Sequence, residues 1–203
     1  MGALREVVSG VLTWPWRSEP HGYDFNGYLV RDPGGNICID PVTADEDVFA
    51  TLAREGVAVV ALTNRNHVRA AAEVRARTGA RVLIHGADAP HARTQGAVID
   101  GELVPGEQVG PLTVVAVPGK SPGEVAFHWR ERRILIVGDA IIGNPPGACA
   151  FLRDKVMDDP ARLRASVRGL LALDFDVLLV GDGTPILAGA KDGVRTLCES
   201  VAA

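Results

Sequence analysis

Residues 57–69 read VAVVALTNRNHVR, an apolar run that ends abruptly in a polar segment containing His67. A continuous apolar run of this length is typical of a β-strand that is covered on both faces. The same change from apolar to polar residues occurs in three further segments, VVAVPGKSPG (114–123), ILIVGD (134–139) and VLLVGDG (177–183). Functional residues of α/β folds gather at strand ends, so these four segments predict one shared cleft.

The remaining pattern predicts hairpins, then a β-α-β unit, then hairpins again, and finally an α-β-α unit. A doubly wound fold would alternate throughout, so two mixed sheets with helices outside fit better. No linker-like stretch divides the sequence, and residues 1–203 are predicted to form a single domain. The expected strands are Val7–Thr13, Asn26–Arg31, Asn36–Asp40, Val57–Leu62, Arg81–Ile84, Leu112–Val117, Glu124–Trp129, Arg133–Val137 and Val177–Val180. The expected helices are Ala44–Glu55, His67–Thr78 capped by Asn66, one that begins at Pro160 and is capped by Asp159, and Ala190–Val201.

Composition narrows the class of protein. The 203 residues are 47% hydrophobic and 23% charged, as in a globular domain, and 21 Lys and Arg against 25 Asp and Glu give a net charge of −4. This balance argues against nucleic-acid binding, and no apolar run is long enough for a membrane span. No signal peptide is read at the start of the sequence, so a cytoplasmic location is expected. The three cysteines form no C-x-x-C pair and are interpreted as reduced thiols.

The order of these segments resembles the metallo-β-lactamase superfamily. Asn26–Val30 followed by ICIDP (37–41) resembles its early hairpin, and residues 63–69 stand where that family has T-H-x-H-x-D-H. VPGKSPG (117–123) stands at its T-P-G-H-T-P-G-like turn, Asp139 matches its bridging aspartate, and GDG (181–183) stands at its terminal G-H-G. The resemblance implies an α/β (α+β) fold, a four-layer αβ/βα sandwich of two mixed β-sheets with helices outside.

The metal ligands of that family are mostly replaced here. The family binds one or two metal ions with five His and two Asp, whereas this chain has five His in all. Without gaps, the ligand positions of the T-H-x-H-x-D-H segment become Asn64, Asn66, Val68 and Arg69. With a two-residue gap, Asn64 replaces the first His and Asn66-His67 replaces the Asp-His pair; we favour this register because it aligns the predicted helix. The other histidines, His21, His85, His91 and His128, are interpreted as structural or surface residues.

In both registers Lys120 and Asp182 replace histidines, and Asp139 is unchanged. Amides are poor zinc ligands and an ammonium group repels a cation, so a dinuclear zinc centre is not expected. Three interpretations stay open. In the first, Lys120 replaces the metal charge and pairs with Asp139 or Asp182. In the second, one divalent metal ion binds to His67, Asp139 and Asp182. In the third, Lys120 performs metal-free acid–base chemistry.

Two function classes follow from the resemblance. One is a divergent hydrolase of small esters or thioesters, with Asp139, Lys120 and Asp182 catalytic and Asn64, Asn66 and Arg69 binding substrate or supporting the site. The other is a non-catalytic relative that binds a small molecule or a protein partner, and a homodimer stays open.

Two further segments are candidates for the cleft. Trp14 and Trp16 flank a proline and could line a pocket mouth, bind a partner or pack at a sheet edge, and the loop 143–148 could cover the cleft.

Overall fold

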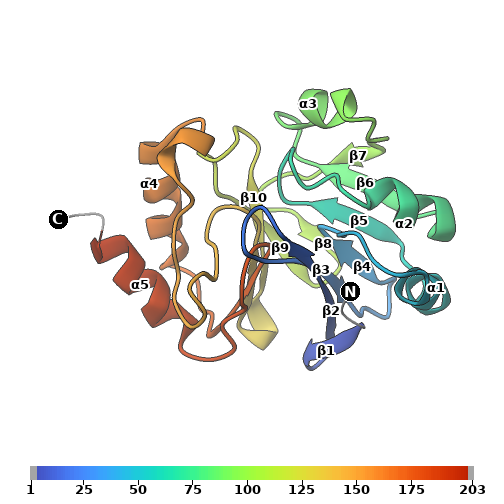
Figure 1. Ribbon diagram of the computed structural model, residues 1–203, viewed down its shortest axis with the longest axis horizontal. Helices are drawn as coiled ribbons and strands as arrows, with labels where there is room; N and C mark the ends of the chain where they lie inside the picture. The colour runs from blue at the N-terminus through green and yellow to red at the C-terminus, as the bar shows by residue number, and fades with distance from the viewer. Residues whose placement is uncertain (1–3, 201–203) are drawn as a thin grey trace.

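The computed structural model describes residues 4–200 and contains two mixed β-sheets between outer layers of helices (Figure 1). The first sheet has the strand order β1-β2-β3-β4-β5-β6-β7, and the second has the order β12-β11-β10-β9-β8. The strands of the first sheet are β1 (Arg5–Val8), β2 (Val11–Ser18), β3 (Tyr23–Val30), β4 (Ile37–Ile39), β5 (Val59–Leu62), β6 (Arg81–Ile84) and β7 (Gly101–Glu102). Those of the second are β8 (Gln108–Val109), β9 (Leu112–Ala116), β10 (Val125–Trp129), β11 (Ile134–Val137) and β12 (Val177–Val180).

Helices cover the outer face of each sheet, which gives the predicted αβ/βα order of layers. The helices α1 (Glu46–Glu55), α2 (Ala71–Thr78) and α3 (Ala89–Thr94) lie on the first sheet, and α4 (Pro160–Leu170) and α5 (Ala190–Ser200) on the second. Two 3₁₀ turns, η1 (Arg130–Arg132) and η2 (Asp154–Val156), complete the elements. No helix within residues 4–200 is both long and apolar enough to cross a membrane.

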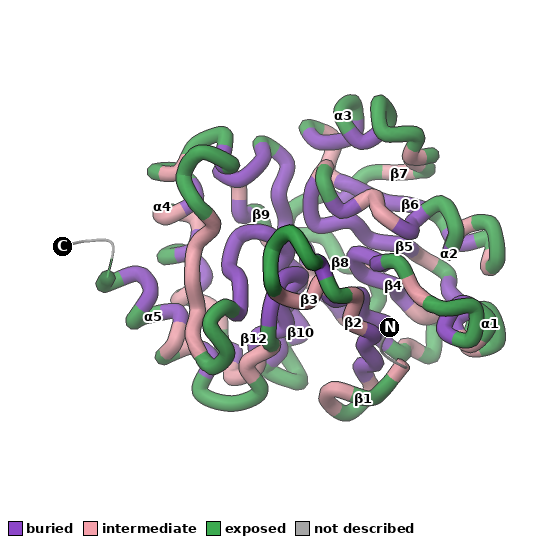
Figure 2. The backbone as a smooth tube through the Cα atoms, viewed as in Figure 1, coloured by how far each residue is buried: buried purple, intermediate pink, exposed green. Residues whose placement is uncertain are grey.

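The core consists of three apolar clusters, one between the sheets and one beneath each helical layer. Both faces of the central strands are therefore buried, as Figure 2 shows by their purple colour. This explains why β5, β11 and β12 read as continuous apolar runs without alternation. The pairs β4·β5, β5·β6 and β11·β12 are parallel, so the carboxyl ends of β5, β11 and β12 deliver their following loops toward the cleft.

The N-terminal strand and the second helix differ from the prediction. Val7–Thr13 is not one strand, because Gly10 has a φ of 79° and turns the chain between β1 and β2. The helix predicted over His67–Thr78 begins at Ala71, and Asn66 does not cap it. Hydrogen bonds to other segments, such as Arg65 N to Asp88 Oδ2 and Ala70 N to Pro41 O, hold residues 65–70 in turns.

β2 continues to Ser18, beyond the predicted end at Thr13, and β3 begins at Tyr23, before the predicted start at Asn26. Other boundaries shift by one or two residues, and Val201 of the predicted last helix lies outside the described residues. The Asp159 cap is present, since its side chain accepts from Arg162 N at 2.9 Å. The pocket-mouth and partner-surface hypotheses for Trp14 are wrong, because its ring is fully buried and its Nε1 donates to Val42 O at 3.1 Å. Trp16 packs against Phe25, with ring centroids 5.7 Å apart.

Candidate active site

A cavity of about 740 Å³ opens where the loops after β5, β9, β11 and β12 meet. Of the predicted site residues, Asn66, His67, Arg69, Lys120, Asp139 and Asp182 line it. The four strand ends identified in the sequence therefore converge as expected. The loop 143–148 contributes Asn144 to the wall.

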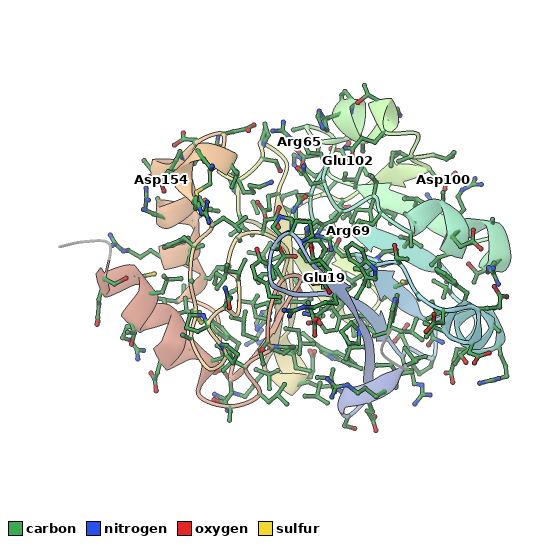
Figure 3. All side chains as sticks on the ribbon, viewed as in Figure 1. Glu19, Arg65, Arg69, Asp100, Glu102 and Asp154 are labelled. Atoms are coloured by element: carbon green, nitrogen blue, oxygen red, sulfur yellow. The ribbon has the colours of Figure 1, made fainter. Side chains whose placement is uncertain are left out.

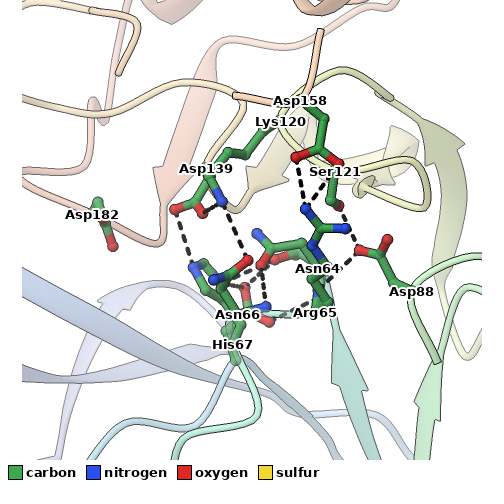
Figure 4. A network of polar contacts seen from close by, with 12 residues as sticks. Asn64, Arg65, Asn66, His67, Asp88, Lys120, Ser121, Asp139, Asp158 and Asp182 are labelled. Carbon is green, nitrogen blue, oxygen red and sulfur yellow. Dashed lines mark hydrogen bonds and ion pairs between the residues drawn. The ribbon is translucent and has the colours of Figure 1, made fainter. Parts of the chain in front are cut away.

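Lys120 enters the site from the loop between β9 and β10 and forms an ion pair with Asp139. Its Nζ lies 2.9 Å from Asp139 Oδ2, and both side chains are 8% exposed. The same Nζ donates to Asn66 Oδ1 at 3.3 Å (Figure 4). Gly119 precedes it with a φ of 141°, and a Cβ there would overlap the backbone of Leu163 in α4. Glycine thus lets this loop lie against α4 and direct Lys120 into the cavity.

His67 lies between two carboxylates at the floor of the cavity. Its Nδ1 is 2.8 Å from Asp40 Oδ2 and its Nε2 is 3.2 Å from Asp139 Oδ1. Burial and the charge of Arg69 oppose protonation, but the two aspartates outweigh them and raise the pKa of His67 to about 10. A ring that faces a carboxylate on each nitrogen donates from both, so His67 is an imidazolium cation.

Asp139 accepts from both neighbours. Although burial favours its neutral form, the charges and hydrogen bonds of His67 and Lys120 hold the pKa of Asp139 well below its usual range.

Asp182 is paired with Arg69 on the opposite side of the site. Arg69 Nη2 lies 3.3 Å from Asp182 Oδ1, and its guanidinium carbon lies 4.2 Å from the centre of the Phe25 ring. Burial and the charge of Asp139 raise the pKa of Asp182 to about 6, against the charges of His67 and Arg69. Asp182 is thus the more basic of the two cavity carboxylates.

Glu124 is a fourth acidic group, and no sequence pattern marks it as a site residue. It is 1% exposed, and neither carboxyl oxygen has a hydrogen-bond partner among the described residues. Burial and the charge of Asp139 raise the pKa of Glu124 well above its usual range, against the charges of Lys120 and His67. Burial at this position therefore favours the neutral form of Glu124.

The charges of the cluster balance without a metal ion. Three carboxylates (Asp40, Asp139 and Asp182) face three cations (His67, Lys120 and Arg69). One donor atom from each of His67, Asp139 and Asp182 lies within 4.8 Å of the others, which is the spacing of a metal site. An imidazolium has no free lone pair for a metal, however, and both cavity carboxylates already hold a cation. A divalent ion at these residues would therefore have to displace Lys120 and Arg69 and take the place of a proton on His67.

Asp88 joins the two loops that carry Asn66, His67 and Lys120. It is fully buried and accepts from Arg65 N at 2.9 Å, Ser121 Oγ at 2.5 Å and Gly123 N at 2.9 Å (Figure 4). One carboxylate therefore fixes the relative position of both loops.

The remaining predicted residues take supporting places. Asn64 is fully buried beneath the cavity, where its Oδ1 accepts from Asn66 N at 2.8 Å. His128 is not part of the cavity lining, and its Nε2 lies 2.8 Å from Asp174 O, as its interpretation as a structural residue implies. His21 is exposed, as its interpretation as a surface residue implies, and it also lines the cavity together with Tyr23 and Phe25 of the β2–β3 hairpin. No motif in the sequence marks this hairpin as part of the site.

Comparison with known proteins gives the family. A family model described as the metallo-beta-lactamase superfamily matches residues 8–202. Hydroxyacylglutathione hydrolase of Fuscovulum blasticum is 31% identical over 161 residues, which are 75% of this chain and 59% of that protein. The hydroxyacylglutathione hydrolase of a Methylobacterium is 32% identical over 178 residues, which are 81% and 64% of the two chains. The chain thus spans less than two thirds of the length of these relatives.

Solved structures agree on the architecture. TTHA1623, solved in a di-iron-bound form, is 27% identical with a TM-score of 0.67 and covers 88% of this chain and 96% of its own. FIM-1 from Pseudomonas aeruginosa, solved in a mono-zinc form, is 15% identical with a TM-score of 0.76, and the match covers 98% of this chain and 96% of FIM-1. With the family match over nearly the whole sequence, these likenesses show that the chain belongs to the metallo-β-lactamase superfamily.

Proposed function

We propose that this chain hydrolyses small thioesters without a bound metal ion. The observation that carries the proposal is the Lys120 ammonium group, which is paired with Asp139 inside the cavity. The sequence resemblance implies that Lys120 stands where the family has a metal-binding histidine. The substrate class is supported by the relatives, which are named hydroxyacylglutathione hydrolases. Lys120 supplies a fixed positive charge next to the reacting carbonyl group.

Lys120 has a hydrogen available for this task. An ammonium group carries three donors, and Lys120 uses one on Asp139 and one on Asn66. The third is directed at the carbonyl oxygen of the thioester and stabilises the oxyanion that forms on attack. Tyr23 adds a neutral hydroxyl, because burial and the charges of Asp182 and Asp139 raise its pKa to about 12.

Asp182 is the base of the proposed reaction. It removes a proton from water as the water oxygen attacks the carbonyl carbon, and the carbon–sulfur bond then breaks. The products are a carboxylic acid and a thiol, and the proton held by Asp182 passes to the thiolate or to solvent. A thiolate leaves without prior protonation, whereas an amine does not, which favours thioesters over amides for a site with one base.

Hydrolysis of a hydroxyacylglutathione thioester, followed as release of free thiol, tests this proposal. The enzyme is assayed with and without chelator, and its metal content is measured in parallel. We expect turnover that the chelator does not change. Lys120→Gln and Asp182→Asn should each lower kcat by roughly a hundredfold or more. Asp174→Asn, an exposed carboxylate outside the cavity, is the matched control. Activity that is lost with the chelator and restored by zinc would contradict a metal-free mechanism.

One observation favours the second function class, a non-catalytic small-molecule binder. Among the described residues, both cavity carboxylates, Asp139 and Asp182, are already paired with cations. A protein that binds but does not hydrolyse would show saturable binding of the thioester and no release of thiol in the same assay.

A further inference from the structure

The cavity has a basic rim formed by Arg153, which directly precedes the 3₁₀ turn η2, and Lys155, which lies within it; both line the cavity. Both are exposed, and neither has an ion-pair partner within residues 4–200. The acidic residue between them is Asp154, which Figure 3 labels. Its Oδ1 lies 2.6 Å from Arg164 Nη2. Its charge is therefore directed at α4 and does not neutralise the rim.

The rim charges are not cancelled from inside the cavity. Lys120 is paired with Asp139, and Arg69 is paired with Asp182, so these inner charges cancel. Arg153 and Lys155 then leave the cavity lining positive, although the whole chain has a net charge of −4. A positive cavity in an acidic protein attracts anions selectively, because the rest of the surface repels them.

Arg69 adds an unused donor on the inner side. Its Nη1 is buried and has no hydrogen-bond partner among the described residues, while its Nη2 is held by Asp182.

An apolar wall faces this charge. Phe25 and Tyr23 lie with their ring centroids 6.0 Å apart, and His21 lies 5.2 Å from Phe25. Phe151 and Val156 belong to the lining contributed by the segment that carries the rim. A cavity of about 740 Å³ with an apolar wall and a few convergent polar groups has the size and character of a small-molecule site.

We propose that this cavity selects small molecules that carry a carboxylate, with Arg153 and Lys155 binding the anionic group and the aromatic wall binding the apolar part. The inference rests on the proposed function only where it names the substrate, a thioester that carries a separate carboxylate. Binding itself needs no turnover.

Two probes that differ only in charge test the selection. Binding of 3-phenylpropionate and of 3-phenylpropanamide is measured by titration of the full chain, with amide chemical shifts as the readout. We expect the carboxylate to bind roughly tenfold more tightly than the amide, and added salt to reduce this preference. In the double variant Arg153→Gln/Lys155→Gln, the two probes should bind within about twofold of each other, because two exposed charges account for most of the preference.

The matched control is Arg93→Gln/Arg130→Gln, which removes the same charge from two exposed arginines outside the cavity. It should keep the wild-type preference. Equal binding of both probes to the wild type, absence of saturable binding of either probe, or an equal loss in the control would each overturn the proposal. A charge preference without thioester turnover would leave this inference standing and contradict the proposed hydrolase. Turnover of neutral and anionic thioesters with the same KM would support the proposed hydrolase and contradict this inference.

Discussion

A double-mutant cycle on Lys120 and Asp139 measures the interaction free energy between the ammonium group and the carboxylate that it balances in the proposed metal-free site. The two charged atoms lie 2.9 Å apart and both side chains are 8% exposed. At an effective dielectric constant of about 20, their attraction is about 6 kcal/mol. Each single variant relieves the desolvation of the group that it removes, so the cycle cancels desolvation and reports the pairwise attraction, and we expect a coupling of about 3–6 kcal/mol between Lys120→Met and Asp139→Asn. Lys120→Met alone should cost about 3 kcal/mol, because Asp139 keeps His67 as a partner.

The assay is urea unfolding near neutral pH, followed by far-ultraviolet circular dichroism, for the wild type, both single variants and the double variant. The control cycle uses the surface pair of Arg133 and Asp174, which lie 3.1 Å apart and are 53% and 66% exposed. Its coupling should stay below about 1 kcal/mol and disappear in high salt, whereas the coupling of the buried pair should persist.

The outcome decides the charge-replacement argument. If the two cycles give equal couplings, or if Lys120→Met is as stable as the wild type, the ammonium group does not balance Asp139 and the reasoning is refuted. Metal content of the Lys120→Met protein should be measured as well, because a gain of bound zinc would show that the remaining donors fit an ion after all.

Three further predictions follow from the site and its supporting loop. His67 has a pKa of about 10 in the folded chain and about 6.5 when unfolded, so its contribution to stability is complete below about pH 6.5 and is lost as the pH rises toward 10. The difference in unfolding free energy between the wild type and His67→Gln should therefore become smaller as the pH rises from about 6.5 to about 10. A difference that stays constant in urea titrations over these pH values would contradict this reasoning. Asp182 must be deprotonated to act as a base, so kcat should fall as the pH drops through about 6, and measured pH profiles should show this limb in the wild type but not in Asp182→Asn. Gly119→Ala should lower the unfolding free energy by about 3 kcal/mol or more, against about 1 kcal/mol for Gly147→Ala, whose Cβ meets nothing. Similar thermal melts for the two glycine variants would refute the close approach of Gly119 to α4.

The sequence was sufficient to predict the fold where local pattern and burial agree. The segments 57–62 and 133–137 contain central strands whose two faces are both covered. Burial of both faces requires a continuous apolar run, which can be recognised in the local sequence alone. The two-residue strands β7 and β8 were missed because only their pairing with β6 and β9 defines them. The start of α2 was misplaced because the donors of residues 65–70 bind distant acceptors that no local pattern reveals.

The candidate site likewise contains residues that the local sequence could predict and residues that it could not. Lys120, Asp139 and Asp182 could be predicted to meet, because each lies in the loop that follows a strand and these strand ends converge. The hairpin residues His21, Tyr23 and Phe25 could not, because they reach the cavity only through the packing of β3 against the end of β12. The charge of His67 was equally hidden, since it depends on Asp40, which lies 27 positions earlier.

In the proposed metal-free mechanism, side-chain cations take the place of a metal ion, and this changes what the site can do. A metal ion both polarises a carbonyl group and lowers the pKa of bound water, whereas an ammonium group performs only the first task. Water must then be activated by a carboxylate, which limits the chemistry to substrates with a good leaving group. The cations also become part of the folded structure, because each holds a buried carboxylate in its charged state. A variant that loses activity at Lys120 or Asp182 therefore identifies a catalytic role only when its unfolding free energy shows that the chain is still folded at the assay temperature.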